Sequence, residues 1–343
     1  MLRLFIEVWR DTLEFLFDYG LFLAKAVTIV VAFALVVGLI AGAAMRQKPK
    51  KGEFQFTDLS DDYRQLQTEL QGELLDKKAL KRWSKQQKKA ETTESLPTTF
   101  VIDFHGSMAA AEVDALREEV TAVLAVATPE DEVFVRLESG GGVVHGYGLG
   151  ASQLDRIRQR GINLTVAVDK VAASGGYMMA CIANRIIAAP FAIIGSIGVL
   201  AQLPNFHKLL QKNDIDFEQF TAGEFKRTVT LFGENTEKGR QKFQQELEQT
   251  HQLFKDHVFA HRDVLNMAEV ATGEYWLGRQ ALELKLIDVL QTSDDYLIEQ
   301  IATRRVMQVK FQQKKKLAER MGAGAAVALD QLWQKLSSFQ WQK

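Results

Sequence analysis

The stretch TFVIDFHG (Thr99–Gly106) decides the class of fold, because it is a short apolar run that ends in glycine. Such a run is typical of a buried strand. The segments EVFVRLE (Glu132–Glu138) and INLTVAVD (Ile162–Asp169) repeat this pattern further along the chain. Ser107–Ala127 and Gln153–Arg160, which lie between these runs, carry apolar side chains at helical spacing. Strands that alternate with helices predict an α/β fold with βαβ units and a mainly parallel sheet.

The length and composition indicate a folded protein. The chain has 343 residues, of which 47% are hydrophobic and 25% charged, and about 150 residues per domain predicts two units. The formal net charge of −1 argues against a nucleic-acid-binding role for the whole chain. Its single cysteine, Cys181, excludes both a disulfide framework within the chain and a cysteine-rich metal site.

A long uncharged segment lies near the N-terminus. Residues 26–45 read AVTIVVAFALVVGLIAGAAM, 20 residues without a charge, which is enough to span a bilayer core. We predict a transmembrane helix over residues 21–45, preceded by a flank over residues 1–20. A cleaved signal peptide and a buried helix are the alternatives, and the long flank with its acidic residues argues against the signal peptide. The basic residues that follow the helix favour the cytoplasm for the rest of the chain, although the small difference in charge leaves the side of the membrane open.

The rest of the chain divides into three parts by composition. Residues 46–97 form a polar basic linker, and its stretch Lys77–Lys89 holds seven basic residues without an acidic one. A solvated helix or tether is favoured there over a lipid-binding element. Residues 98–300 are the expected α/β domain, and residues 301–343 a basic, amphipathic tail. Within the domain, the apolar run Met178–Leu200 is interrupted by arginine and proline, so it predicts a short buried helix, a strand and a turn.

Two glycine-containing motifs follow predicted strands. In Ser139–Val143 (SGGGV), adjacent glycines let backbone N–H groups approach a phosphate or an oxyanion. A flexible glycine-rich turn over Gly140–Gly150 explains the same pattern. In Ala172–Tyr177 (AASGGY), Ser174 lies between a strand and a helix, which suits a nucleophile beside free helix N–H groups. An ordinary helix N-cap is the alternative for Ser174.

A serine nucleophile needs a base, and the sequence offers no obvious histidine. His207 lies downstream of Ser174, His105 and His145 lie upstream, and none of them stands in a telling motif. A lysine acts as a base when burial favours its neutral form. Lys226, in the motif TAGEFKRT, is the candidate.

Several motifs together resemble a known family. They are AASGGY around Ser174, GSIGV at Gly195–Val199, TAGEFKRT around Lys226 and TGEYWLGRQALELKLID at Thr272–Asp288. These segments are similar to the membrane-bound serine peptidases of the signal peptide peptidase A family. Among them, the inner-membrane SohB type has one N-terminal membrane helix and a single catalytic domain. The resemblance covers roughly Phe100–Val289.

The resemblance implies both a fold and a set of site residues. The family has a ClpP/crotonase-like fold and a Ser–Lys dyad, so residues 98–300 are expected to form a peptidase domain. Ser174 matches the nucleophile, Lys226 the general base and Ser196 a serine that orients the base. Gly142 and Gly175 match the oxyanion-hole donors through their N–H groups. ClpP-type relatives have a proline where this chain has Gly140, so the choice between Gly141 and Gly142 stays open.

The resemblance also implies the partners of the chain, and two other functions compete with the one it implies. A peptide substrate, a lipid bilayer at the bacterial inner membrane and a ring of identical chains are expected, with no nucleic acid, metal or organic cofactor. The long stretch Thr236–His261, with apolar side chains at helical spacing, supports a helix that contributes to a core or an interface. A crotonase-like acyl-CoA enzyme and a non-enzymatic membrane scaffold are the competing functions.

Overall fold

The fold was analysed in a computed structural model. It describes residues 52–90 and 96–313, together with Leu21, Lys25, Val27, Thr28 and Ala32. The compact unit to which the fold belongs spans Glu53–Gln313.

A single sheet of ten strands forms the centre of this unit. The order of its main part is β1-β10-β2-β3-β4-β6-β9, and β5, β7 and β8 extend it from β3. All the pairings from β10 to β9 are parallel, and β7–β8 is antiparallel. The strands are β1 (Gly52–Asp58), β2 (Thr98–Gly106), β3 (Glu132–Ser139), β4 (Asn163–Val168), β5 (Val171–Ala173), β6 (Arg185–Ala188), β7 (Ile193–Gly195), β8 (Tyr275–Leu277), β9 (Val289–Leu290) and β10 (Arg305–Gln313).

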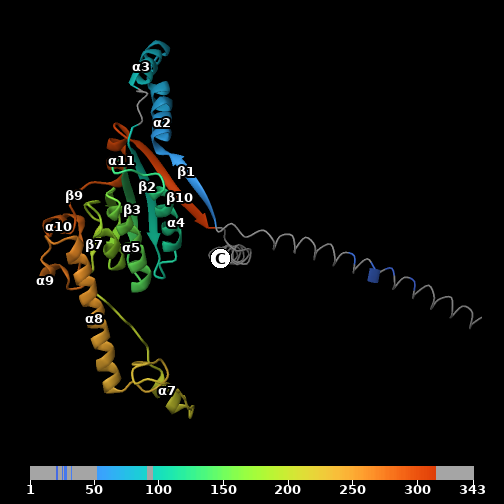
Figure 1. Cartoon of the computed structure of the whole chain (residues 1–343), viewed down its shortest axis with the longest axis vertical. Coiled ribbons are helices and arrows are strands. Elements are labelled where there is room, and N and C mark those ends of the chain that lie inside the picture. Colours follow the sequence, from blue (N-terminus) through green and yellow to red (C-terminus); the bar gives the residue numbers. More distant parts are fainter. Residues whose placement is uncertain are drawn as a thin grey trace, which may run out of the picture. The chain divides into compact units, whose positions relative to one another are not determined.

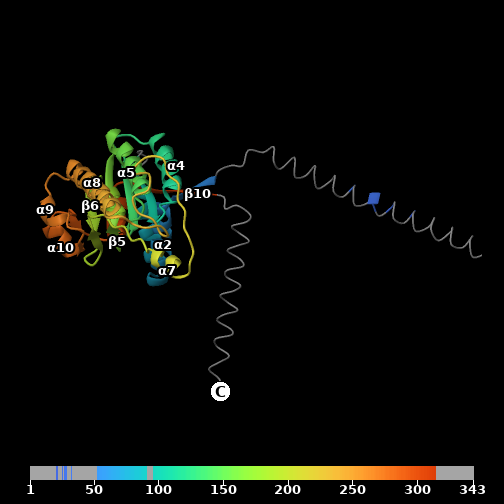
Figure 2. The same cartoon turned by 90° about the horizontal axis from the view of Figure 1, so that it is seen from below.

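Helices connect the strands, as the parallel pairings require. Helices α4 and α5 lie side by side, and α5 packs against α6 (Figures 1 and 2). The helices are α2 (Leu59–Leu74), α3 (Lys77–Ala90), α4 (Val113–Leu124), α5 (Val144–Gln159), α6 (Gly175–Ala180), α7 (His207–Lys212), α8 (Glu237–His261), α9 (Met267–Val270), α10 (Gly278–Glu283) and α11 (Ser293–Ile301).

Alternating side chains of the central strands divide the core into two layers. On β3, Val133 and Val135 belong to the larger apolar cluster with α4, α5 and α6, whereas Phe134 belongs to a smaller cluster with α11. Phe134 stacks on Tyr296 of α11, with ring centroids 4.8 Å apart. Because successive strand side chains point to opposite faces, strands covered on both faces read as continuous apolar runs. This explains the pattern from which the sheet was predicted.

The α/β fold and its mainly parallel sheet are confirmed. The run from Met178 to Leu200 does contain the end of α6, the strands β6 and β7 and a turn. One prediction was wrong: α5 begins at Val144, so only residues 140–143 of the predicted glycine-rich turn lie outside a helix. Glycines spaced along α5 are compatible with a helix because they let neighbouring elements pack closely; a side chain at Gly150 would meet Met179 Sδ at 2.9 Å.

The segments expected to flank the domain contribute to it. Within the predicted linker, β1 adds to the sheet beside β10, and α2 and α3 follow. β10 lies within the residues assigned to the C-terminal tail, and its Val306 is buried. Polar composition hid both strands: β1 is the edge strand, and β10, which lies between β1 and β2, has exposed residues at both of its ends. Nearly all of the transmembrane helix predicted over 21–45 lies outside the described residues, and no helix among the described ones is long and apolar enough to cross a bilayer.

Candidate active site

Ser174 lies at a sharp junction between β5 and α6. Its backbone has φ 51° and ψ −118°, in a region that residues other than glycine rarely adopt. Its N–H donates to Gly195 O at 2.8 Å. Residues held in such conformations persist only where the surrounding structure fixes them, and they concentrate at functional sites. The junction presents a serine hydroxyl at the start of a helix.

Ser196 occupies the equivalent place on the neighbouring strand. The parallel register of β5 and β7 pairs Ala173 with Gly195, so Ser174 and Ser196 follow at adjacent strand ends. Ser196 also has φ 51°. Its N–H donates to Glu274 O at 2.7 Å, and its hydroxyl reaches Gly273 O at 3.4 Å. Two strained serines therefore stand side by side at one edge of the sheet.

A chain of hydrogen bonds holds the glycine loop that follows β3. Gly141 N–H donates to Ser139 Oγ at 3.1 Å. The Ser139 hydroxyl pairs with the Tyr147 hydroxyl, which donates to Ser107 O at 2.8 Å. Burial raises the pKa of Tyr147, so this phenol remains a neutral donor. The chain fixes the loop beside the start of α6.

Three positions in this region have no room for a side chain. A Cβ on Gly141, which has φ +89°, would lie 2.7 Å from Ser174 Cβ. One on Gly142 would lie 2.1 Å from a backbone carbonyl oxygen, and one on Gly175 would lie 2.4 Å from Tyr147 Cγ. Glycine is therefore required at each of these positions by close packing.

A cavity of about 530 Å³ opens onto this group. Ser174, Ser196, Gly175 and the glycine loop all line it. Apolar side chains form much of the remaining wall: Met108, Val144, Met178, Val199, Leu200 and Phe254. A largely apolar pocket with a few convergent polar groups is the usual form of a substrate site.

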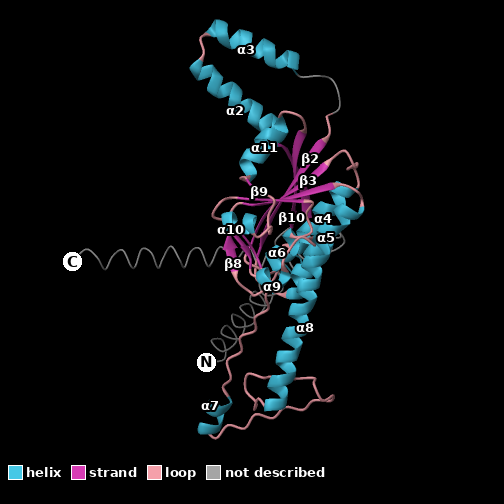
Figure 3. Cartoon of the chain, turned by 90° about the vertical axis from the view of Figure 1, so that its left-hand side faces the viewer, coloured by secondary structure: helices cyan, strands magenta, loops and turns pink. Residues whose placement is uncertain are grey.

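Lys226 is not among the residues that line the cavity. It is exposed, on a segment between β7 and α8 that also carries α7. Its neighbour Phe225 lies under Lys238 Nζ, 5.7 Å from the ring centroid, near the beginning of α8. Figure 3 shows α7 near that end of α8. The cavity instead touches α8 at Thr250, about 18 Å further along the helix at 1.5 Å per residue.

His251 is a cavity residue that sequence reasoning did not select. It lies on α8, lines the cavity, and its Nε2 is 3.1 Å from Ile197 O. Its distance from Ser174 along the chain removed any local motif that would have pointed to it. The three histidines named from the sequence lie elsewhere: His105 is near Glu138, and His207 begins α7. None of His105, His145 and His207 is among the described residues that line the cavity.

Two family models match the chain. The model described as peptidase family S49 N-terminal matches residues 14–154, and the peptidase family S49 model matches residues 156–320. The chain belongs to peptidase family S49. Its substrates are therefore peptides and its reaction is peptide hydrolysis, in agreement with the resemblance found in the sequence.

Curated relatives extend over most of the chain. It is 49% identical over 329 residues to a probable protease SohB of Haemophilus influenzae, covering 91% of this chain and 93% of that protein. It is 46% identical over 303 residues to a probable protease SohB of Buchnera aphidicola subsp. Schlechtendalia chinensis, covering 83% and 99%. A remote likeness to the 1510-N membrane-bound stomatin-specific protease, solved with a substrate peptide, has 12% identity and a TM-score of 0.41, covering 66% of this chain and 97% of that one.

Proposed function

We propose that this chain is a membrane-anchored serine endopeptidase that uses Ser174 as its nucleophile and Lys226 as its general base. The observation that carries the proposal is the strained junction at Ser174, which opens into the cavity beside the glycine loop. An ordinary N-cap serine would not need positive φ, since N-caps typically have extended backbones.

The chemistry follows from the positions of the backbone donors. Neutral Lys226 takes the proton from Ser174, whose alkoxide attacks the peptide carbonyl. N–H groups of Gly142 and Gly175 hold the tetrahedral oxyanion, each lowering the barrier by about 3 kcal/mol. Gly142 is preferred over Gly141 because the Gly141 N–H already donates to Ser139 Oγ. Lys226 then protonates the leaving amine, and water hydrolyses the acyl-enzyme. None of these steps requires a metal or an organic cofactor.

Ser196 positions the base in this mechanism. It stands beside Ser174 at the adjacent strand end and lines the same cavity. A serine hydroxyl accepts from an ammonium and donates to a neutral amine, so it orients Lys226 in both of its forms. Its weak contact with Gly273 O, at 3.4 Å, leaves the hydroxyl available for that role.

We propose that Lys226 reaches Ser174 from a second copy of the chain. Within one chain, the segment that carries Lys226 packs about 18 Å along α8 from the cavity. This segment exposes large apolar side chains, among them Phe220 at 89% and Phe225 at 41%. Contiguous exposed apolar surface is typical of protein interfaces. A closed ring, in which each chain extends this segment to its neighbour, covers the apolar side chains and completes every site.

The membrane anchor is proposed from sequence. The uncharged residues 26–45 are long enough to cross a bilayer, and the inner membrane is the location of the family that the motifs resemble. The apolar wall of the cavity suits peptides with small or apolar side chains, such as cleaved signal peptides or fragments of membrane proteins.

The nucleophile is tested with a serine-reactive fluorophosphonate or β-lactone probe on the full chain. We expect the wild type and Ser152→Ala, a serine exchange on the exposed side of α5, to be labelled, and Ser174→Ala to be unlabelled. An acyl-CoA enzyme or a scaffold predicts no labelling that depends on Ser174. Equal labelling of wild type and Ser174→Ala would refute the assignment.

His251 provides the alternative base, because it alone of the described histidines lines the cavity. Its Nε2 would have to leave Ile197 O before it took a proton from Ser174. If Lys226 is the base, His251→Gln should retain most of the hydrolysis while Lys226→Ala and Lys226→Arg lose it, since a guanidinium stays protonated. The opposite result would indicate a Ser–His enzyme.

A further inference from the structure

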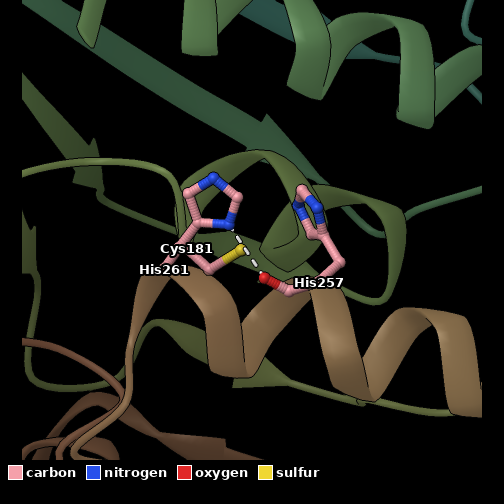
Figure 4. Close-up of side chains that lie close together, drawn as sticks. All are labelled: Cys181, His257 and His261. Atoms are coloured by element: carbon pink, nitrogen blue, oxygen red, sulfur yellow. Dashed lines mark hydrogen bonds between the residues drawn. The ribbon is translucent and has the colours of Figure 1, made fainter. Parts of the chain in front are cut away.

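One compact group of potential metal ligands is already satisfied within the chain. Cys181, His257 and His261 lie close together, and Figure 4 shows the two imidazoles beside the thiol. His257 Nε2 lies 3.0 Å from Met178 O, and His261 Nδ1 lies 2.8 Å from His257 O. The thiol donates to Met178 O at 3.3 Å. Because the atoms that face one another are engaged with backbone carbonyls, packing accounts for this group.

Helix α3 carries positive charge that no partner in the described chain neutralises. Between Lys77 and Lys89 the sequence holds seven basic residues and no acidic one. None of the basic side chains described there forms an ion pair with another described residue. All of them are exposed: Lys77, Lys78, Lys81, Arg82 and Lys85. The sequence alone favours a solvated tether here, whereas the structure folds the stretch into a helix that presents its charges to solvent.

The opposite face of α3 is apolar. Ala79, Leu80 and Trp83 lie on that face and are half-buried. Helix α2 packs on β10, but the main contact of α3 is with α2, and α3 projects away from the sheet (Figures 1 and 3). A helix with lysines on one face and leucine and tryptophan on the other is typical of helices that lie in the surface of a membrane.

We propose that α3 is a second membrane contact of this chain and binds the anionic head groups of phospholipids. The proposal rests on the membrane anchor proposed above. Six residues, 46–51, separate the predicted membrane segment from β1, and an extended chain of that length spans about 20 Å. The anchor therefore keeps the domain close to a bilayer surface, where clusters of basic residues are attracted to anionic lipids.

The distribution of charge favours a lipid surface over a second protein. Lysine is depleted at protein–protein interfaces, and four of the five described basic residues of α3 are lysines. The formal net charge of the chain is −1, so the residues outside Lys77–Lys89 carry eight more negative than positive charges. An anionic bilayer therefore repels most of the chain and attracts α3. The competing partner is the α2 helix of a neighbouring chain, which carries Glu69 and Glu73.

A second attachment would orient the domain. β1 begins next to the tether, and α3 begins beyond the end of α2. The seven residues of β1 span about 23 Å and the sixteen of α2 about 24 Å. A body that is held at two separated points does not rotate freely about its anchor. Helix α3 would therefore hold the Ser174 cavity in one orientation toward the bilayer, whereas the anchor alone only keeps it nearby.

The test places an environment-sensitive fluorophore on α3 of the full chain. Ser84→Cys provides the attachment point, because the native Cys181 is buried. The labelled chain is reconstituted into vesicles of phosphatidylcholine alone, or of equal parts of phosphatidylcholine and phosphatidylglycerol. We expect a blue shift of the emission only where phosphatidylglycerol is present. The shift should disappear at about 1 M salt, which shortens the range of charge interactions to about 3 Å.

Matched charge reversals identify the helix that binds. Lys77→Glu/Lys81→Glu reverses two exposed charges one turn apart on α3, and Lys208→Glu/Lys212→Glu does the same on α7. Each basic residue near an anionic surface raises the ratio of docked to undocked helix about fivefold. The α3 variant should therefore lower this ratio at least about 25-fold, and the α7 variant should match the wild type.

Three results would overturn the proposal. They are an equal blue shift in both kinds of vesicle, an equal loss in the α3 and α7 variants, and a shift in detergent without lipid that grows with protein concentration. The last result would assign α3 to a neighbouring chain. Flotation with phosphatidylcholine vesicles at high salt tests the anchor separately. If the chain does not float there, the anchor is wrong, and docking by α3 would still be measured as salt-sensitive binding to vesicles that contain phosphatidylglycerol.

Discussion

An equal mixture of Ser174→Ala and Lys226→Ala chains should hydrolyse peptides that neither variant cleaves alone. The reason lies in the separation along α8. The segment that carries Lys226 packs beside Lys238, and the Ser174 cavity meets α8 at Thr250, about 18 Å away. A lysine's four-carbon stem does not bridge that distance. If Lys226 is the base, it therefore has to come from a neighbouring chain.

The size of the recovered activity follows from assembly statistics. In a closed ring, each site takes its serine from one chain and its lysine from the next. With the two variants mixed equally and at random, about one site in four receives both an intact serine and an intact lysine, whatever the number of chains. A site built within one chain receives both in no case, because every chain lacks one of them.

The assay is hydrolysis of a fluorogenic peptide by co-expressed chains that carry two different affinity tags and are purified through both. Because purification through both tags removes assemblies of a single variant, about a quarter of the wild-type kcat is expected for a large ring and a larger share for a small one, with an unchanged KM. A mixture of Ser174→Ala with the double variant Ser174→Ala/Lys226→Ala is the control, because it assembles in the same way but contains no intact serine. No recovery in doubly tagged assemblies would refute the arrangement, and full activity of Lys226→Ala alone would remove the lysine from the mechanism.

Three further outcomes are expected. Ser196→Ala should lower kcat, though less than loss of the nucleophile does, and activity should fall at low pH where the base is protonated; equal kcat in both proteins would remove Ser196 from the site. Burial raises the pKa of Glu119 to about 7 from a usual 4.5, so the folded state favours the protonated carboxyl. The contribution of protonated Glu119 to the free energy of unfolding is complete below about pH 4.5 and falls by about 3 kcal/mol as the pH rises through 7. Urea unfolding of Glu119→Gln should show a flatter dependence of this free energy on pH. Gly175→Ala should abolish probe labelling, because its Cβ would lie 2.4 Å from Tyr147 Cγ, whereas Gly148→Ala meets no atom within 4 Å and should be labelled normally.

The central strands were predictable because their sequences satisfy both faces of the sheet. Val133, Phe134 and Val135 alternate between two apolar clusters, so the run carries no polar residue that would obscure it. β1 and β10 escaped prediction for the opposite reason. The outer side chains of β1 and the end of β10 face water, and their polar letters resemble those of a linker. The apolar content of a strand reflects how many of its side chains are buried, and β1 buries few of them.

The residues of the candidate site that lie close together in the sequence were predictable, and those that come from distant parts of the sequence were not. Ser174 and Gly175 stand in one short motif, and the structure places Ser196 beside them because β5 and β7 are in parallel register. His251 lines the same cavity from a helix far along the sequence. No periodicity or spacing links it to Ser174, since only the packing of α6 against α8 brings them together.

Helix α8 runs from the segment that carries Lys226 to the core beside the Ser174 cavity. Its 25 residues span about 37 Å. Phe254 and Val258 anchor its C-terminal half in the core. In its N-terminal half only Gly239 is buried, and Lys238 there pairs with Glu224 of the segment that carries Lys226. Because a helix of this length is stiff, the packing of its anchored half against α6 determines where its free half presents that segment. A neighbouring chain that binds the free end would then act on the Ser174 cavity through a helix that forms part of its wall.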